Sequence, residues 1–178
     1  LIINNLKKLI KNSKKLNIKY FIIPLVDNAS IKNKKHEDMV VELFDKLLKF
    51  SFKKINILFE SDYSPKNLDR FIRRFKSKRI GINYDCGNSA SLGYNFDDEK
   101  IYFEYIKNVH IKDRIYKGET VRLGRGDANL FKILKYFKNK KYKGKFIFQT
   151  ARCRDNNHVK ELIINKKYLL NLKILKIF

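Results

Sequence analysis

The sequence predicts an α/β fold that forms the C-terminal part of a TIM, or (β/α)8, barrel, comprising about strands 4 to 8. Short apolar runs alternate five times with amphipathic stretches, which indicates a parallel sheet with crossover helices. The first run continues as PLVDNAS, which lacks the glycine-rich phosphate loop of open doubly wound sheets. A full barrel needs roughly 250 residues. Because the chain has 178 residues and begins without methionine inside an expected helix, we expect one partial barrel over residues 1–178, lacking about three N-terminal units.

Three helix–strand pairs are expected in the first half of the chain. Apolar residues recur at helical spacing over 2–16 and 39–48, and Ser64 followed by Pro65 marks the start of a third helix. The strand expected after each helix is a short apolar run: 20–26, 55–60 and 79–85.

The second half is expected to continue the alternation, with Asp127 capping one of its helices. In chain order the expected elements are a Gly/Asn/Ser-rich loop at 86–95, a helix near 97–105, a strand at 106–111, a helix after 127, a strand at 145–150 and a helix over 158–175.

The composition shows a large basic excess, with a formal net charge of +23, which raises the question of nucleic-acid binding. Only 9 of the 41 basic residues are Arg, and the lysines are spread from Lys7 to Lys176 without an aromatic-interleaved stripe, so a nucleic-acid partner is disfavoured. No apolar run approaches the ~20 residues of a membrane span, and no secretory signal is readable. We therefore expect a soluble, cytoplasmic protein. Cys86 and Cys153 form no CxxC pair, so neither a zinc knuckle nor a disulfide framework is indicated and we expect reduced thiols.

The expected strands end on side chains that can bind a metal or move a proton: Glu60, Asp85, His110 and Gln149. Each has a structural alternative, since the carboxylates could cap loops, His110 could be a hydrogen-bonded core residue and Gln149 could satisfy backbone groups. The carboxyl ends of barrel strands converge on one face, so the four together favour a shared site. Two carboxylates, an imidazole and an amide oxygen suit one divalent ion such as Mn²⁺, Mg²⁺, Co²⁺ or Zn²⁺. Such an ion stabilises the enediolate formed when a proton leaves a sugar carbon beside the carbonyl group.

Five segments resemble the xylose-isomerase-like sugar-phosphate isomerases and epimerases, notably the L-xylulose 5-phosphate 3-epimerase and hexulose phosphate isomerase branch. They are FESDYSP (59–65), YDCGNSASLG (84–93), NVHIKDR (108–114), VRLGRGDANLFKILKYF (121–137) and YKGKFIFQT (142–150). The resemblance covers about residues 1–172, and its most specific parts are the HxKD strand end and the G-x-G turn before a helix. It implies that the visible strands are the fourth to eighth, and that Glu60, Asp85, His110 and position 149 bind the metal.

Position 149 departs from this pattern, because the family usually has glutamate where the chain has Gln149. In the epimerases that glutamate and the one matching Glu60 form a pair of proton-transfer groups, and an amide cannot act as a carboxylate base. We therefore expect an isomerase or epimerase of a sugar or sugar phosphate in which Glu60 is the base and Gln149 completes the site. A one-base aldose–ketose isomerisation fits better than a two-base epimerisation, and a weakened or lost activity stays open.

Several polar residues after the strands are candidates for substrate binding: Lys112, Asn88, Arg114, Arg125 and Arg152. Alternation along the strand points Lys112 to the same side as His110. The arginines lie in the loops after the expected seventh and eighth strands, where barrels often bind phosphate, and a guanidinium can grip such an anion in a bidentate manner. Arg122, a further candidate, and Arg154 are expected to coat the surface, Asp113 to orient its loop, and His36 and His158 to lie at the surface.

Two other functions compete with the isomerase. Abasic-site endonucleases are similar barrels with three zinc ions, but they need additional histidines, and Asn88 stands where one of them is expected. A non-catalytic sugar-binding relative is the second, suggested by Gln149. Metal content separates them, since one divalent ion supports the isomerase, three zinc ions the nuclease and none the binder. The expected partner is a small sugar or sugar phosphate, and a homo-oligomer stays open.

Overall fold

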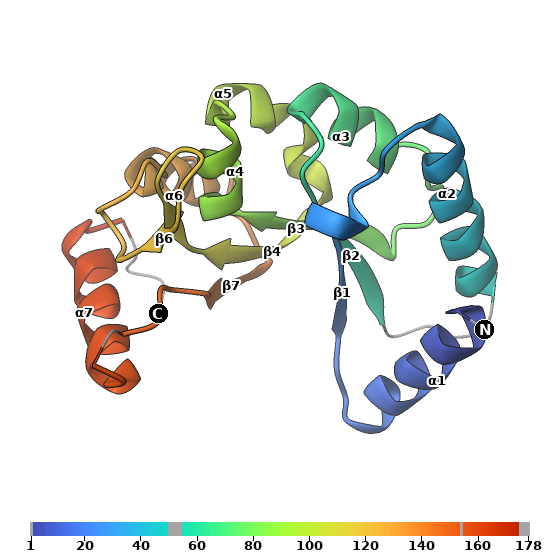
Figure 1. Cartoon of the computed structure of the whole chain (residues 1–178), viewed down its shortest axis with the longest axis horizontal. Helices are drawn as coiled ribbons and strands as arrows, with labels where there is room; N and C mark the ends of the chain where they lie inside the picture. The colour runs from blue at the N-terminus through green and yellow to red at the C-terminus, as the bar shows by residue number, and fades with distance from the viewer. Residues whose placement is uncertain (1, 50–54, 154, 175–178) are drawn as a thin grey trace. The chain divides into compact units, whose positions relative to one another are not determined.

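The computed structural model describes residues 2–49, 55–153 and 155–174 and contains one five-stranded sheet (Figure 1). The strand order is β1-β2-β3-β4-β7, and the pairs β1–β2, β2–β3 and β4–β7 are parallel. The strands are β1 (Tyr20–Leu25), β2 (Asn56–Ser61), β3 (Ile80–Asp85), β4 (Ile106–Ile111) and β7 (Lys145–Phe148). All five predicted strands are therefore confirmed, although β7 ends two residues earlier than expected.

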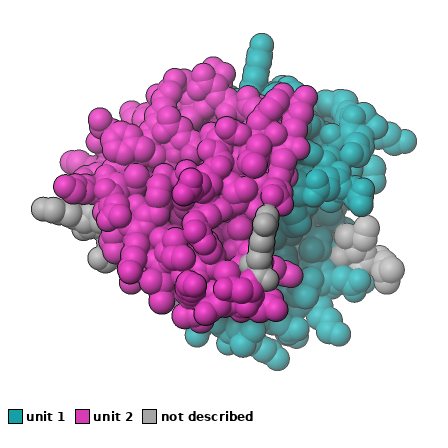
Figure 2. Space-filling view, turned by 60° about the vertical axis from the view of Figure 1, so that its left-hand side comes forward, with its two compact units in different colours: residues 1–83, 101–106 teal, residues 84–100, 107–178 magenta. Residues whose placement is uncertain are grey.

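The chain divides into two compact units, shown in different colours in Figure 2. Unit 1 comprises residues 1–83 and 101–106, and unit 2 comprises residues 84–100 and 107–178. The boundary falls inside β3 and inside β4, so each of these strands carries residues of both units.

Unit 1 places its helices on one side of β1 and β2 (Figure 1). Its elements besides the strands are α1 (Ile2–Lys15), a 3₁₀ turn η1 (Asp27–Ala29), α2 (Lys34–Lys49) and α3 (Pro65–Ile72). Phe59 of β2 is fully buried, and its ring lies 4.9 Å from that of Phe44 on α2 and 5.4 Å from that of Phe71 on α3. This aromatic cluster fixes the strand residue that immediately precedes Glu60.

A buried carboxylate ties α2 to α3 in the same unit. Glu37 is 1% exposed and accepts hydrogen bonds from Arg70, Arg74 and the Tyr63 hydroxyl. The bond from Arg70 chiefly lowers the pKa of Glu37 well below its usual range, and burial, aided by Glu37, raises the pKa of Tyr63 to about 12. The ionised form of Glu37 is thus the stable one in the folded chain.

Besides its part of the main sheet, unit 2 contains helices and a hairpin. They are α4 (Cys86–Leu92), α5 (Phe96–Glu99), the antiparallel hairpin of β5 (Asp113–Arg114) and β6 (Thr120–Val121), α6 (Leu130–Asn139) and α7 (His158–Asn171), whereas the 3₁₀ helix η2 (Lys100–Tyr105) lies mostly in unit 1. Phe137 of α6 anchors the core, with its ring 4.8 Å from that of Tyr142 and 5.8 Å from that of Phe146 on β7.

Two local predictions for this half were wrong. The expected loop at 86–95 is largely the helix α4, because the Asp85 side chain caps its start and Gly93, at a φ of 76°, ends it. The expected helix near 97–105 is confirmed, although it consists of one turn of α-helix, α5, followed by the 3₁₀ helix η2, which leads directly into β4. Asn129 rather than Asp127 caps α6, since the Asp127 carboxylate accepts a hydrogen bond from the Tyr116 backbone N–H.

Candidate metal centre

Asp85, the last residue of β3, has two carboxylate oxygens in different surroundings. Its Oδ1 accepts a hydrogen bond of 2.8 Å from the Asn88 backbone N–H and so caps α4. Its Oδ2 is buried and has no hydrogen-bond partner within the described part of the chain. His110 Nδ1 and Lys112 Nζ each lie 3.6 Å from Oδ2, which is within the range of an ion pair but longer than a hydrogen bond. A buried carboxylate oxygen without a donor is costly, so this atom is suited to a ligand.

His110 and Lys112 reach Asp85 from the end of β4. Val109 and Ile111 are buried in the core, and alternation along the strand points His110 and Lys112 away from them. The His110 side chain is 11% exposed and that of Lys112 15% exposed. The prediction that these two side chains share one side of the strand is therefore confirmed.

Glu60 lies near the end of β2 and is half-buried. Its Oε2 accepts a hydrogen bond of 2.6 Å from the Asn83 side-chain amide on β3, the strand paired with β2. Asn83 is two residues before Asp85, so alternation places both of these side chains on the same face of β3. Sequence reasoning missed Asn83; the signal was this spacing of two from Asp85.

The described residues include a group that could hold a metal ion: Glu60, Asp85 and His110. Each offers one ligand atom, and these atoms lie within 4.8 Å of one another. Two carboxylates and an imidazole form a donor set that suits Zn²⁺, Mn²⁺ or Mg²⁺. The buried Oδ2 of Asp85 without a donor is the observation that makes the set fit a cation.

A polar network centred on Asn88 adjoins Asp85. The Asn88 Oδ1 accepts hydrogen bonds from Lys112 Nζ at 3.1 Å and from Arg114 at 3.0 Å. Arg114 also donates to the Gly118 carbonyl, which fixes its guanidinium within the β5–β6 hairpin. The structure thus brings together three predicted substrate-binding residues, and Asn88 joins the two cations.

Gln149 is one residue beyond the end of β7, rather than within the strand as expected. Its backbone N–H donates to the Ile111 carbonyl at 3.1 Å, and its Oε1 accepts from Lys112 Nζ at 3.5 Å. The amide oxygen therefore faces the lysine. Its role as a metal ligand stays a prediction.

Asp113, fully buried, holds the G-x-G turn as the sequence predicted. Its Oδ2 accepts from the backbone N–H groups of Gly124 at 2.8 Å and Gly126 at 3.0 Å, and its Oδ1 accepts from Ala128 N–H at 3.0 Å. A Cβ at Gly126 would lie 2.3 Å from the Asp113 carboxylate and 2.6 Å from the Arg114 carbonyl oxygen, so only glycine fits there.

The other predicted arginines lie outside the Asn88 network. Arg122, Arg125 and Arg152 line a separate cavity, and Arg122 also makes a bidentate ion pair with Glu161, with both hydrogen bonds at 2.7 Å. Arg122 is thus half exposed but engaged in the fold, and Arg154 lies outside the described residues. His36 is half-buried and His158 is exposed; each accepts a local backbone hydrogen bond through Nδ1.

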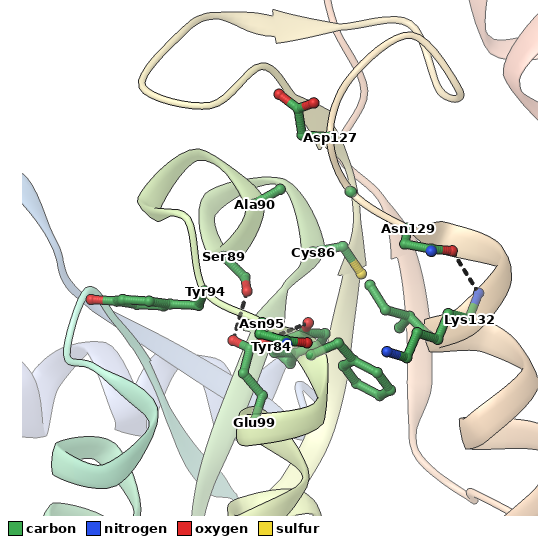
Figure 3. A pocket seen from close by; sticks show the side chains of 13 residues that line it. Tyr84, Cys86, Ser89, Ala90, Tyr94, Asn95, Glu99, Asp127, Asn129 and Lys132 are labelled. Atoms are coloured by element: carbon green, nitrogen blue, oxygen red, sulfur yellow. Dashed lines mark hydrogen bonds between the residues drawn. The ribbon is translucent and has the colours of Figure 1, made fainter.

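A pocket of about 190 Å³ lies between α4, α5 and the start of α6 (Figure 3). Its buried polar centre is Glu99, which accepts hydrogen bonds from the Tyr84 hydroxyl at 2.7 Å and the Ser89 hydroxyl at 2.6 Å. Burial raises the pKa of the Cys86 thiol in its wall well above the usual value, so this sulfur stays protonated at neutral pH. Both cysteines are free thiols, as the sequence predicted.

Parallel strands with crossover helices and ligand groups at their carboxyl ends are typical of a (β/α) barrel enzyme. The chain belongs to the Xylose isomerase-like TIM barrel family, whose model matches residues 2–165. The predicted fold class and family are thereby confirmed, while the branch within the family stays a prediction. Among the described residues, no helix has the length and apolar character needed to cross a membrane.

Solved structures share this fold. A xylose isomerase domain protein from Planctomyces limnophilus has a TM-score of 0.82 at 18% identity, over 96% of this chain and 65% of its own. The IOLI protein with a bound zinc atom has a TM-score of 0.81 at 18% identity, over 99% and 70%. A D-tagatose 3-epimerase-like protein has a TM-score of 0.73 at 20% identity, over 96% and 69%.

The chain spans only part of the relatives that it matches. The protein MJ1311 of Methanocaldococcus jannaschii, described as uncharacterized, is 24% identical over 119 residues, which cover 62% of this chain and 39% of that relative. The first solved structure above is covered over 65% of its length. These comparisons establish the family and the fold, and the activity of a whole protein is a matter for proposal.

Proposed function

We propose that this chain is part of a metal-dependent isomerase or epimerase of a sugar or sugar phosphate, in which Glu60, Asp85 and His110 bind one divalent ion. The single observation that carries the proposal is the proximity of their ligand atoms, within 4.8 Å of one another, beside a buried Asp85 oxygen that lacks a donor. Two carboxylates balance the charge of the ion, and Mn²⁺, Mg²⁺, Co²⁺ and Zn²⁺ all suit the set.

When bound, the ion supplies electrostatic stabilisation of the negative charge that develops on the sugar oxygens. Glu60 takes the proton from the carbon beside the sugar carbonyl and returns it to the carbonyl carbon, while the hydroxyl proton on the first carbon passes to the carbonyl oxygen, so that the carbonyl group moves by one carbon. The Asn83 amide donates a hydrogen bond of 2.6 Å to Oε2 and so fixes the orientation of this carboxylate. Lys112 and Arg114, which share Asn88 as an acceptor, hold substrate oxygens as they gain charge.

Gln149 bears on the choice between the two reaction types. An amide has no proton-accepting carboxylate, so Glu60 is the one carboxylate base of the proposal, and a proton transfer on one face of the substrate is favoured. The Gln149 oxygen, 3.5 Å from Lys112 Nζ, helps to position that ammonium and is a further candidate ligand. We accordingly favour aldose–ketose isomerisation over epimerisation.

The comparisons support this class of reaction. The family name refers to xylose isomerase, and one similar structure is described as D-tagatose 3-epimerase-like. The IOLI structure contains zinc, and another similar barrel, from Mycobacterium smegmatis, is a complex with magnesium. Sugar chemistry and a divalent ion therefore recur among proteins of this fold.

The test measures deuterium uptake from heavy water into a panel of ketoses and ketose phosphates, with Mn²⁺ and the full chain. Glu60→Gln should reduce uptake by about 100-fold or more, the range of one general base. Glu104→Gln is the matched control, because Glu104 is an exposed carboxylate of the same unit, 67% exposed. Uptake that survives Glu60→Gln would reject the assigned base, and three bound zinc ions would favour an abasic-site endonuclease.

A further inference from the structure

The ammonium group of Lys112 lies at the edge of the candidate metal centre. Its Nζ is 3.6 Å from Oδ2 of Asp85, the buried carboxylate oxygen that accepts no hydrogen bond from the described residues. The same oxygen is the atom whose surroundings fit a metal ligand. A cation of the chain and a divalent ion from solution are therefore both attracted to one carboxylate.

The packing of the Lys112 side chain sets the position of this ammonium. The side chain is 15% exposed, and its stem lies against the first turn of α4. A Cβ at Gly87 would come 2.6 Å from Lys112 Cγ and 3.1 Å from both Cβ and Cδ, so glycine at this position leaves the space that the stem occupies. Because the stem is packed, the charge is held beside Asp85 at a smaller cost in side-chain entropy than a solvent-exposed lysine would incur.

Two neutral oxygens and one carboxylate surround the Lys112 ammonium. Asn88 Oδ1 lies 3.1 Å and Gln149 Oε1 lies 3.5 Å from Nζ, and both belong to uncharged amides. Within residues 2–49, 55–153 and 155–174, Asp85 is the one anionic group that forms an ion pair with Lys112. A glutamate at position 149 would offer the ammonium a second negative charge, whereas glutamine leaves it to Asp85.

A second cation favours the Asp85 side of this network. The Arg114 guanidinium donates to the same Asn88 oxygen at 3.0 Å and is held in place by the Gly118 carbonyl. Like charges that share one acceptor repel each other. Lys112 is therefore more stable toward Asp85 than toward the β5–β6 hairpin.

The charges of the site determine how strongly it attracts a divalent ion. Glu60 and Asp85 contribute two negative charges, and Lys112 adds one positive charge beside Asp85. Because the Asp85 side chain is 1% exposed, solvent and salt screen these charges little. The ammonium thus stabilises the buried carboxylate and, by repulsion, weakens the binding of a second cation to it.

We propose that Lys112 is a tethered counter-ion of the metal centre, a cation of the chain that balances Asp85 and competes with the divalent ion for its carboxylate. Lys112 thereby determines the metal affinity of the site, in addition to its proposed contact with substrate oxygens. This inference rests on the proposed function for the identity of the metal ligands, but it concerns binding of the ion and not proton transfer.

The experiment measures Mn²⁺ affinity of the full chain by calorimetry, together with thermal unfolding in chelator. Lys112→Met keeps an unbranched stem and removes the charge. Mn²⁺ should bind this variant roughly tenfold more tightly, because the repulsion is removed. Its Tm in chelator should fall by about 2–4 °C, because the buried carboxylate loses its cation. A misfolded variant would bind the ion more weakly, so the gain in affinity distinguishes the inference from a structural defect.

Two further variants test whether the effect belongs to this pair of charges. Lys166→Met removes an exposed lysine of α7 in the same unit and should change neither the affinity nor the Tm. In the Asp85→Asn background, Lys112→Met should no longer lower the Tm in chelator, because the charge that the ammonium balances is already absent.

Equal or weaker Mn²⁺ binding by Lys112→Met would overturn the inference. An equal gain in affinity with Lys166→Met would also overturn it, because the effect would then come from the net charge of +23. A fall in Tm that persists in the Asp85→Asn background would reduce Lys112 to a packing role. Absence of Mn²⁺ binding in the wild type and in Lys112→Met would reject the metal centre and the inference together, whereas deuterium uptake unaffected by Glu60→Gln beside tighter Mn²⁺ binding would reject only the catalytic assignment.

Discussion

Replacing Asp85 by Asn separates its metal-binding role from its role in the fold. The amide keeps an oxygen that can accept the 2.8 Å hydrogen bond from Asn88 N–H, so the first turn of α4 stays capped. The negative charge on the buried side, where Oδ2 has no hydrogen-bond donor, is lost. The variant should therefore bind the metal more weakly, while its free energy of unfolding without metal should stay the same or rise.

The magnitudes follow from these surroundings. Loss of a group that merely supports a ligand costs about 10–100-fold in metal affinity, so loss of a ligand should cost about 100-fold or more, or roughly 2.7 kcal/mol. Burying an acceptor without a donor costs about 1–3 kcal/mol. Lys112 Nζ and His110 Nδ1, each at 3.6 Å, offset part of this cost in the wild type. We expect the metal-free variant to match or exceed the wild type in stability by up to ~1 kcal/mol, or about 2–4 °C in Tm.

The assay combines Mn²⁺ titration with thermal unfolding in chelator and in excess Mn²⁺. The wild type should gain Tm with Mn²⁺, because an ion that binds the folded chain stabilises it, and the variant should gain little. Asp98→Asn is the control, since Asp98 is an exposed carboxylate of α5 in the same unit. Unchanged Mn²⁺ affinity, or a clear loss of stability in chelator, would refute the reasoning.

Two further predictions concern the scaffold. Glu37→Gln should lower the free energy of unfolding by about 2–3 kcal/mol at neutral pH. This is less than the usual cost of breaking a buried ion pair, because the Arg70 side chain is 49% exposed. Because the folded pKa of Glu37 is lowered, its contribution is present above the unfolded pKa near 4.5 and is lost as pH falls further; urea unfolding from pH 7 to 3 should show this loss in wild type and little of it in the variant. Gly126→Ala should cost about 1–3 kcal/mol, since its Cβ would meet the Asp113 carboxylate and the Arg114 carbonyl; equal urea midpoints for wild type and variant would show that the turn yields freely.

The sequence predicted the strands well because buried parallel strands are continuous apolar runs, and β4 has the expected bounds, 106–111. The prediction from sequence was wrong where residues of low helix propensity form a helix because both of its ends are capped. The Gly, Asn and Ser residues of α4 predict a loop. They form a short helix because Asp85 caps its N-terminus and Gly93, in the αL conformation, caps its C-terminus. Asp127 and Asn129 are both good caps two residues apart, and the contact of Asp127 with Tyr116 N–H decided between them.

The sequence could predict those residues of the candidate site that lie at the ends of predicted strands. Glu60, Asp85 and His110 were predicted together because the carboxyl ends of parallel strands meet at one edge, and the structure groups them as a possible metal site. The hydrogen bond from Asn83 to Glu60 and the shared acceptor Asn88 depend on the strand register and the first turn of α4, which no local pattern reveals. Glu37 likewise bonds Arg70, 33 residues away, a pairing that only the packing of α2 on α3 creates.

The β5–β6 hairpin has a consequence for selectivity. Its ladder pairs Arg114 with Thr120 in one fixed register, and Asp113, at the base of β5, clamps the turn that follows β6. The hairpin thus holds the Arg114 guanidinium in one position beside Asn88. A hairpin of another length would move this guanidinium relative to Asn88 and so change which substrate oxygens it reaches, without altering any proposed metal ligand.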